Sequence, residues 1–448
     1  MSLALRSRLS RQNTRCSIVL KMLFTRPKFF VALCLVCLFP AIALSQALAR
    51  PGWAGFVSPS EAWWKGSSVY EIDPHGFGSL EEITKHLDYI HSLGADALLL
   101  THFQPDAAHP QSVDPALGTL DNLEDLIHQA STRNMRILID LGQLAPSTDL
   151  NSIARYWLNQ GVAGFHIAGS QQADQLRKIA SSYIGQRIVI GDLDPSAPID
   201  PHGPQLLLDT RLSNVTQFSA AALRPEIESI QPTQNMLLAT DTPREARSIT
   251  RLGDGQHDAD IAKILATILF ANRASALIYY GQEIGLPSSK SAPTEASLMK
   301  WGVVPPPPSA HTRRSLHPAP PADPATVVAQ EANPSSLLSW YRRLIALHHS
   351  NATISSAPTT LVLNHDDQNV LAWVRKPQAV TYKNPPVVIV CNLTAKPVHL
   401  SLKGDMQKLH LKGSFLRTVL RSDEGMGPMS LDDMTIPPYG IYIGGLGY

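Results

Sequence analysis

The chain has 448 residues, of which 44% are hydrophobic and 17% charged, and its formal net charge is +1. This composition is typical of a globular protein large enough for two domains. The balanced charge gives no reason to expect nucleic acid as a partner. Three of the four cysteines precede residue 50, so Cys391 stands alone in the rest of the chain. That excludes an internal disulfide there, and no cysteine–histidine spacing indicates zinc.

The first 49 residues read as an export signal. A basic stretch ending at Lys28 precedes an apolar run over residues 29–44, and Ala47, Leu48 and Ala49 fit a cleavage site. Residues 1–49 are therefore predicted to be a signal peptide, which would make the protein periplasmic or secreted. The alternative is an uncleaved membrane anchor, because residues 29–49 are about long enough to span a bilayer. Residues 50–61 read as a linker.

Eight apolar runs alternate with amphipathic segments between residues 62 and 350. The strand-like runs cover residues 69–72, 95–100, 135–141, 163–168, 187–193, 205–210, 235–240 and 274–281. Helices are expected over residues 80–93, 122–130, 150–160, 171–184, 216–230, 258–273 and 335–349. Strands that alternate with helices predict a parallel sheet, and eight repeats predict a (β/α)₈ barrel, the TIM barrel fold. Residues 194–204 carry four prolines, so that crossover is predicted to lack a helix.

The pattern changes at about residue 351. Short apolar runs separated by turns cover residues 360–363, 370–374, 387–392, 398–402, 416–420 and 439–443, with no helical pattern between them. This predicts a C-terminal antiparallel β-sandwich domain over residues 351–448. The proline-rich residues 305–308 and 317–324 read as a surface loop, with a partner-binding segment as the alternative.

Six motifs occur in an order that resembles the α-amylase superfamily, glycoside hydrolase family 13, and within it the α-glucosidase-like branch. They are WWKGSSVYEI from Trp63, VDPALGTL from Val113, GVAGFHIA from Gly161, LATDTPR from Leu238 with TRLGD from Thr250, IYYGQEIG from Ile278, and MKW from Met299. The resemblance covers the chain from residue 62 onward. It implies a barrel that places sugar-binding residues at the carboxyl ends of its strands.

The resemblance also implies a catalytic apparatus, and this chain departs from it. A retaining glycosidase needs two carboxylates about 5–5.5 Å apart, one as nucleophile and one as acid and base. Carried over by position, the nucleophile falls on Ala168, the acid/base on Asp192 and the transition-state-stabilising carboxylate on Asp241. Alanine cannot attack a sugar, and Asp192 is one methylene shorter than the family's glutamate. The resemblance therefore implies a pseudoenzyme whose retaining hydrolysis is lost or strongly impaired.

The remaining sugar-facing positions are mixed. The resemblance implies that Asp140, His166 and Arg244 contribute to substrate binding, whereas Leu144 and Ala145 replace an asparagine and a histidine of the family motif. The small domain that the family inserts after the third strand is missing, which argues against a structural calcium, and no metal or other cofactor is expected. Simpler roles are open as alternatives: Asp140 and Asp192 as caps of turns, and Asp241 paired with Arg244.

Three functions follow as hypotheses. The first is an exported glycoside-hydrolase-like protein, linked to carbohydrate metabolism, that binds an oligosaccharide without the family's hydrolysis. The second is a non-enzymatic type II membrane subunit that resembles the heavy chains of amino-acid transporters, although their partner-linking cysteine has no counterpart between Leu38 and Cys391. The third is a rewired hydrolase in which Asp192 and Asp241 activate a water molecule in inverting geometry. Membrane contact is expected only through the N-terminal segment.

Overall fold

The computed structural model describes residues 62–447 apart from 107, 143–147, 169, 198–199, 201, 231–234, 290–291, 293, 303–322 and 424. Residues from Ala62 onward form one compact unit, separate from residues 1–61. The predicted signal peptide, the linker, Leu144, Ala145 and most of the proline-rich segment therefore lie outside the described residues. In the described part of the chain, no helix combines the length and apolar character needed to cross a bilayer.

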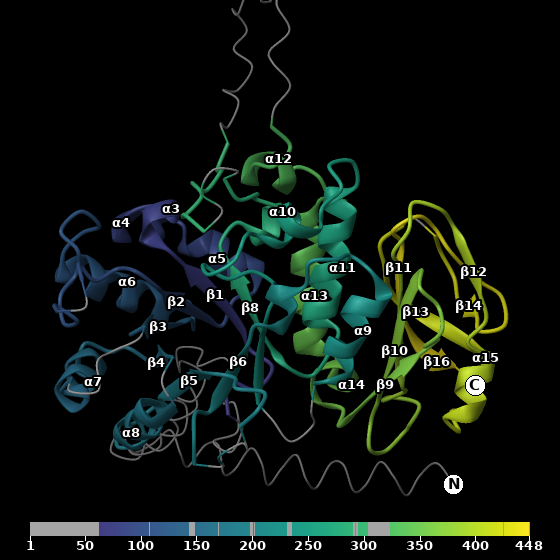
Figure 1. Cartoon of the computed structure of the whole chain (residues 1–448), viewed down its shortest axis with the longest axis horizontal. Coiled ribbons are helices and arrows are strands. Elements are labelled where there is room, and N and C mark those ends of the chain that lie inside the picture. Colours follow the sequence, from purple (N-terminus) through teal and green to yellow (C-terminus); the bar gives the residue numbers. More distant parts are fainter. Residues whose placement is uncertain are drawn as a thin grey trace, which may run out of the picture. The chain divides into compact units, whose positions relative to one another are not determined.

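The core of the unit is a closed barrel of eight parallel strands in sequence order, with β1 hydrogen-bonded to both β2 and β8 (Figure 1). The strands are β1 (Ser68–Ile72), β2 (Ala97–Leu100), β3 (Arg136–Asp140), β4 (Gly164–Ile167), β5 (Ile188–Asp192), β6 (Leu206–Asp209), β7 (Met236–Ala239) and β8 (Ser275–Tyr279). All eight lie within the predicted runs or within one residue of them. The TIM barrel prediction is confirmed.

Most of the helices around the barrel also follow the prediction. They are α3 (Pro74–Phe77), α4 (Leu80–Lys85), α5 (Leu87–Leu93), α6 (Leu120–Thr132), α7 (Leu150–Asn159), α8 (Ser170–Ala180), α9 (Ala220–Glu228), α10 (Ser248–Leu252), α11 (Asp258–Phe270), α12 (Val327–Glu331), α13 (Leu337–Ser350) and α14 (Ala352–Ser356), with 3₁₀ turns η1 (Arg211–Asn214) and η2 (Gln282–Ile284). The single helix expected over residues 80–93 is two helices that meet at His86. Between β5 and β6 the described residues form turns and no helix, as the prolines predicted.

Alternating strand residues divide the packing into two layers. One set points into the barrel and includes Val69, Leu99, Leu138, Ile190 and Leu277, all at most 1% exposed. The other set faces the surrounding helices and belongs to the large cluster that continues under the β-domain. Because the interior is filled with branched side chains, the barrel is a packed core, and ligand chemistry is restricted to its ends.

The C-terminal β-domain has a six-stranded antiparallel sheet of order β14-β13-β16-β11-β10-β9 and a two-stranded sheet β12-β15. Its strands are β9 (Thr359–Leu363), β10 (Val370–Lys376), β11 (Val387–Asn392), β12 (Val398–Leu400), β13 (Phe415–Arg421), β14 (Met429–Ser430), β15 (Met434–Ile436) and β16 (Ile441–Gly447). Helix α14 already lies within residues 351–448, and a second short helix there, α15 (Lys403–Lys408), also corrects the expectation that this region has no helix. Its Met406 is buried in the domain core, so tertiary packing stabilises a turn that has only a weak helical pattern.

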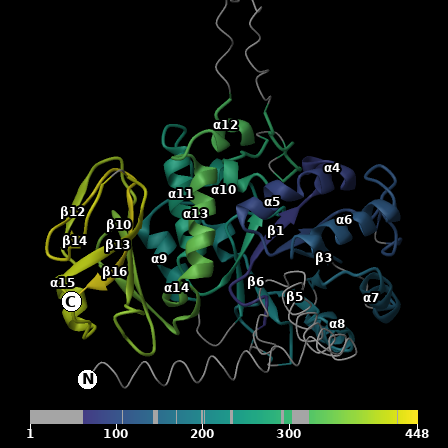
Figure 2. The ribbon, with the colours of Figure 1, turned by 180° about the vertical axis from the view of Figure 1, so that it is seen from behind.

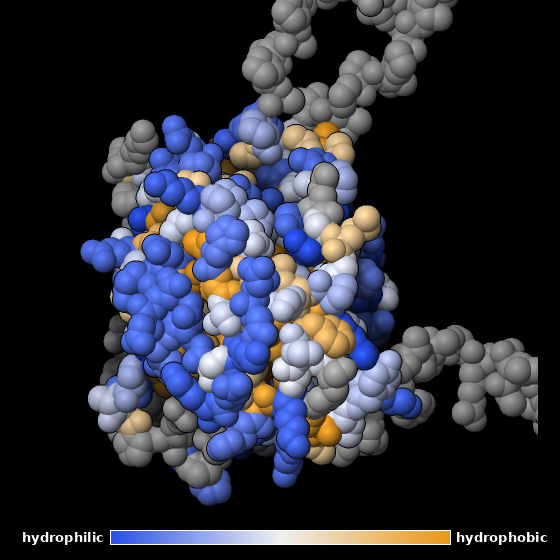
Figure 3. All heavy atoms as spheres, turned by 90° about the vertical axis from the view of Figure 1, so that its right-hand side faces the viewer, coloured by the Kyte–Doolittle hydropathy of each residue, from blue (hydrophilic) through white to orange (hydrophobic). Residues whose placement is uncertain are grey.

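The β-domain lies beside α9 and α14 of the barrel in views from front and back (Figures 1 and 2). Arg224 of α9 donates to the carbonyl oxygens of Asn364, Asp367 and Val370 at 3.3, 2.7 and 3.3 Å. Trp373 donates its indole N–H to the carbonyl of Ala271 at 2.9 Å. The outer face of the β-domain is mostly hydrophilic, with apolar side chains scattered among polar ones (Figure 3).

Candidate functional site at the barrel mouth

His166 bridges two carboxylates at the carboxyl ends of three neighbouring strands. Its Nδ1 lies 2.7 Å from Asp140 Oδ1 at the end of β3, and its Nε2 lies 3.0 Å from Asp192 Oδ1 at the end of β5. Ionised carboxylates only accept hydrogen bonds, so both ring nitrogens must donate and the ring is an imidazolium. Burial opposes this charge, but Asp140 and Asp192 outweigh it and raise the pKa of His166 to about 10.

Both oxygens of Asp192 are engaged. The second one, Oδ2, accepts from Nη1 of Arg244 at 3.0 Å. Burial would raise the pKa of Asp192, but His166 and Arg244 lower it below its ordinary value. A general acid must hold a proton near the working pH, and a carboxylate with two cationic partners does the opposite. The position that the resemblance assigns to the acid/base thus belongs to a charge network.

Asp241 is not part of this network. It is 2% exposed, and its Oδ1 accepts from the backbone N–H of Ser248 at 2.5 Å, with Arg251 at 4.0 Å. Burial raises its pKa above the ordinary value. The proposed ion pair between Asp241 and Arg244 is wrong, because Arg244 reaches across the mouth to Asp192 instead.

Ala168 lies directly after β4, where the resemblance places the nucleophile. Its backbone N–H donates to the carbonyl of Gly142 at 3.2 Å, and the N–H of Gly142 donates to Asp140 Oδ1 at 2.8 Å. The backbone at this position therefore joins the ends of β3 and β4. The methyl side chain adds no chemistry.

Sequence reasoning missed Glu71, which points into the mouth from β1. Glu71 is 6% exposed, and its Oε2 has no hydrogen-bond partner in the described part of the protein. Burial, followed by the charge of Asp140, raises the pKa of Glu71 to about 8. The available signal was an acidic residue at an inward-facing position of an otherwise apolar strand.

A second missed group surrounds Asp73, which is 6% exposed. Its two oxygens lie 3.1 Å from His75 Nδ1 and 2.9 Å from His102 Nδ1. Burial would raise the pKa of Asp73, but the hydrogen bonds and charge of His102, together with His75, lower it. His102 has a φ of 48°, in the left-handed region that few residues other than glycine adopt.

The space at the mouth is small. A cavity of about 70 Å³ is lined by residues that include Glu71, Asp140, His166 and Arg244. Pockets for small molecules usually measure roughly 300–1,000 Å³, so this cavity is smaller than a typical ligand pocket. A neighbouring cavity of about 440 Å³ extends from Asp140 past His75, His102 and Gln104.

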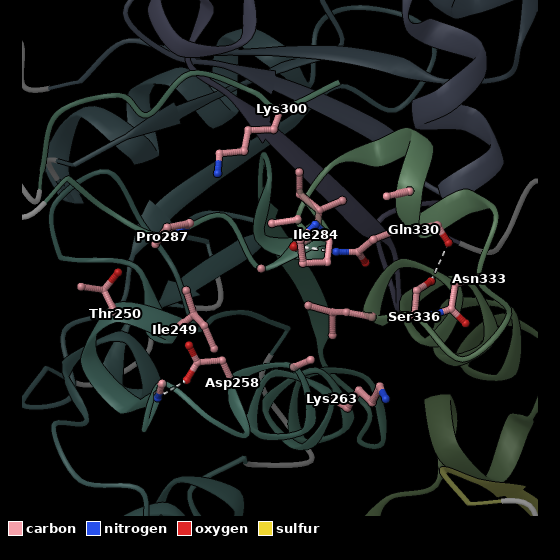
Figure 4. A pocket seen from close by; sticks show the side chains of 18 of the residues that line it. Ile249, Thr250, Asp258, Lys263, Ile284, Pro287, Lys300, Gln330, Asn333 and Ser336 are labelled. Carbon is pink, nitrogen blue, oxygen red and sulfur yellow. Dashed lines mark hydrogen bonds between the residues drawn. The ribbon is translucent and has the colours of Figure 1, made fainter. Parts of the chain in front are cut away.

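A larger pocket lies on the flank of the barrel, away from this network. It measures about 920 Å³ and is lined from α10, α11, η2, α12 and the start of α13. Figure 4 shows Ile249, Ile284 and Pro287 along its wall, with Lys263 and Lys300 on opposite sides. The lysines pair with Asp260 and Asp323, and Gln330 bonds the backbone at Ile284 and Leu338. The polar groups of this pocket are thus largely satisfied from within.

Among the described residues, no cluster of three or more histidine, cysteine or acidic side chains is arranged to hold a metal ion. Within the mouth itself, the histidine nitrogens face carboxylates of the protein. The histidine and carboxyl side chains of the mouth can hold protons and charge at the carboxyl ends of β1 to β5.

The closed parallel barrel, the β-domain behind it and the remnant carboxylates at its mouth define a glycoside-hydrolase-type barrel protein. The family model for the α-amylase catalytic domain matches residues 66–142. The resemblance to the α-amylase family is therefore confirmed over this part of the chain, where the sequence is similar to the family's catalytic domain.

Two kinds of relative share its sequence. Trehalose-6-phosphate hydrolase of Escherichia coli K12 is 37% identical over 95 residues, which are 18% of this chain and only 17% of the hydrolase. The amino acid transporter heavy chain SLC3A2 of Rattus norvegicus is 24% identical over 432 residues, 85% of this chain and 78% of the heavy chain. Similarity to the hydrolase is thus confined to a short segment, whereas similarity to the heavy chain is weaker and extends along the chain.

Solved structures agree on the fold. Trehalose-6-phosphate hydrolase of Bacillus licheniformis superposes with a TM-score of 0.71 at 14% identity, covering 87% of this chain and 100% of that one. An isomaltulose synthase mutant of Erwinia rhapontici in complex with D-glucose gives a TM-score of 0.69 at 16% identity, covering 87% and 100%. At these identities the likeness establishes the architecture alone.

Proposed function

We propose that this protein is a non-catalytic member of the α-amylase family that acts as a membrane-tethered subunit of a larger assembly. The observation that carries the loss of catalysis is the double engagement of Asp192 by His166 and Arg244. The alanine at position 168 removes the nucleophile, and the mouth cavity of about 70 Å³, which Glu71, Asp140 and His166 help to line, is small for a sugar ring.

The subunit role is supported by the extent of the similarities. The match to the transporter heavy chain runs over 85% of the chain, whereas the match to the hydrolase covers 18%. Only residues 141–149 separate β3 from α7, so a domain inserted after the third strand is missing. The basic and apolar residues 1–49 would supply the tether if they are retained.

The hydrolysis arm of the test uses residues 62–448, which contain the complete barrel, the β-domain and their cores. With aryl α-glucosides we expect no turnover above the buffer rate and no covalent glycosyl intermediate with a mechanism-based fluoroglycoside. An α-glucosidase treated in parallel shows that the assay works. Measurable turnover that disappears in the Asp192→Asn variant would overturn the non-catalytic proposal.

The tether arm uses the full chain expressed in cells. Mass spectrometry of the mature N-terminus and extraction of membranes with alkaline carbonate distinguish an anchor from a cleaved signal. We expect residues 29–49 to remain on a carbonate-resistant protein. A mature N-terminus at Arg50 on a protein free in the medium would contradict the tether and leave the hydrolysis result unaffected.

A second candidate function is carbohydrate binding without hydrolysis. The observation in its favour is the cavity of about 440 Å³ beside the mouth, lined by His75, His102, Gln104 and Asp140. Thermal shift with maltooligosaccharides, sucrose and trehalose tests it. A saturable shift that is lost in the His102→Ala variant would support binding at this cavity, and no shift with any of these sugars would exclude it for this set.

A further inference from the structure

Two arginines, Arg136 and Arg187, lie at the end of the barrel opposite the mouth. In the described residues, neither forms an ion pair with an acidic side chain. Arg136 is the first residue of β3, and Arg187 directly precedes β5, so both lie where the strands begin. Both side chains are half-buried. In the described part of the chain, no carboxylate lies within ion-pair distance of either guanidinium, and Nε of Arg187 is buried without a hydrogen-bond partner. Half-buried cations without counter-charges are costly unless something else satisfies them.

Trp63 holds the two arginines in place. The guanidinium of Arg136 lies 4.4 Å from the centre of the Trp63 ring, a cation–π contact. The indole N–H donates to the carbonyl of Gln186 at 2.9 Å, which anchors the loop that leads into Arg187. Trp63 itself packs against the apolar layer inside the barrel. The arginines are thus presented on a rigid base.

The nearest acid does not neutralise them. Asp96 accepts from the backbone N–H of Ser68 at 2.8 Å and lies 3.2 Å from Nε2 of His349. Burial lowers the pKa of Arg136, Asp96 opposes this effect, and the charge of Arg187 lowers it further. The two guanidiniums therefore repel each other, and only part of the charge of Asp96 is available to them.

We propose that Arg136 and Arg187 form an anion site on this face that binds a phosphate group. Planar guanidinium forks match phosphate oxygens and form charge-assisted hydrogen bonds with them. A phosphate would also remove the repulsion between the two cations. At the mouth, by contrast, Arg244 and Arg211 are paired with Asp192 and Asp209.

The phosphate has two sources, a free phosphate or the headgroup of a lipid. Ile184, three residues before Arg187, is 95% exposed. The loop reaches this position through left-handed residues, Gly185 with φ 97° and Gln186 with φ 53°. An exposed isoleucine beside arginines suits an anionic bilayer surface.

The test uses residues 62–448, so that the basic N-terminal segment does not bind lipid itself. The probes are inorganic phosphate, followed by calorimetry, and sedimented vesicles of phosphatidylcholine with and without phosphatidylserine. We compare wild type with R136Q/R187Q. The matched control is R343Q/R417Q, which removes two arginines that also stack on aromatic rings, 4.8 Å from Trp340 and Tyr382. Each arginine contributes about fivefold at an anionic surface, so R136Q/R187Q should bind roughly 25-fold more weakly and the control should bind as wild type.

The arms separate the two sources. Loss of both phosphate and anionic-vesicle binding in R136Q/R187Q, with I184S weakening only the vesicle arm, assigns a lipid headgroup. Loss of phosphate binding without any vesicle binding by wild type assigns a free phosphate. Wild type that binds neither probe, or R136Q/R187Q that binds both as wild type does, overturns the proposal. R136K/R187K keeps the charge and controls for folding; thermal melting of each variant confirms that the barrel is intact.

Discussion

The imidazole of His166 lies 3.0 Å from Asp192 while its other nitrogen lies 2.7 Å from Asp140. One cation thus joins the ends of β3, β4 and β5 at the mouth of the barrel. The side chains of His166 and Asp140 are 5% and 18% exposed, so solvent screens this contact weakly. These contacts hold the ends of the three strands together at the mouth of the barrel and engage both Asp140 and Asp192.

Removal of His166 should destabilise the protein. In H166Q, Asp140 and Asp192 lose their shared counter-charge in a buried setting, and breaking such a pair costs about 3 kcal/mol. The free energy of unfolding in urea at pH 6 measures this. D192N is the control, because Asp192 is more exposed and its amide keeps an acceptor, so its effect should be smaller. An H166Q variant as stable as wild type would show that the network contributes nothing.

The pH dependence of H166Q has a defined sign. The pKa of His166 is about 10 in the folded protein and about 6.5 in an unfolded chain. The stabilisation by the imidazolium is therefore complete below about pH 6.5 and is lost as the pH rises toward 10. The difference in unfolding free energy between wild type and H166Q should shrink across this window. A difference in unfolding free energy that stays constant from pH 6 to pH 10 would contradict the raised pKa of His166.

Substitution of Glu71 should stabilise the protein, whereas substitution of His166 should destabilise it. Its pKa is about 8 in the folded protein and about 4.5 unfolded, so the fold binds a proton that the unfolded chain releases. Wild-type stability should therefore fall as the pH rises from about 4.5 to 8. E71Q, which is neutral at every pH, should be more stable than wild type above pH 8 by at most about 5 kcal/mol. Thermal melting at pH 5 and pH 9 measures this; equal melting temperatures at pH 9 would refute it.

Restoring the nucleophile alone should not restore hydrolysis. In A168D the new carboxylate would face an Asp192 whose pKa is low and whose oxygens are engaged by His166 and Arg244. The acid that must protonate the leaving group would still be missing. We expect no turnover of aryl α-glucosides by A168D, with circular dichroism to confirm folding. Turnover at a rate above that of wild type would show that Asp192 can serve as the acid.

Arg224 should hold the β-domain against the barrel. R224A leaves the carbonyls of Asn364, Asp367 and Val370 without this donor, and a buried acceptor without a partner costs about 1–3 kcal/mol. Hydrogen exchange should become faster in residues 364–370, and the unfolding free energy should fall by about 2 kcal/mol. R417A, on the exposed part of β13, is the control. Unchanged hydrogen exchange in residues 364–370 of R224A would show that Arg224 does not hold the β-domain against the barrel.

The strand and helix pattern was readable because it is local. Alternation along β1 to β8 and the prolines between β5 and β6 depend on neighbouring residues, and the structure confirms both. The short α15 was missed because its formation depends on burial of Met406 in the β-domain core. The break at His86 was missed for a similar reason: the ring of His86 stacks on Trp301 at 3.5 Å, a contact between residues far apart in sequence.

The candidate site was only partly readable. Asp140, His166 and Asp192 were singled out because the family motifs mark their positions, and the structure brings these three together. Arg244 was paired with Asp241, its close neighbour in sequence, whereas it lies against Asp192, 52 residues away. Glu71 stood out only as an acidic residue at an inward-facing position of an apolar strand, and that local signal does not show that its carboxyl group faces the charged groups of β3 and β4.

The sequence by itself determined the barrel, the following β-domain and the absence of a nucleophile at position 168. These follow from local periodicity and from the chemistry of a single side chain. Only the tertiary structure decided which charges meet: closure of the barrel brings strand ends from residues 71 to 244 within reach of one another. Since pairing energies depend on distance and burial, and not on separation along the chain, the network that closes the mouth became visible only in three dimensions.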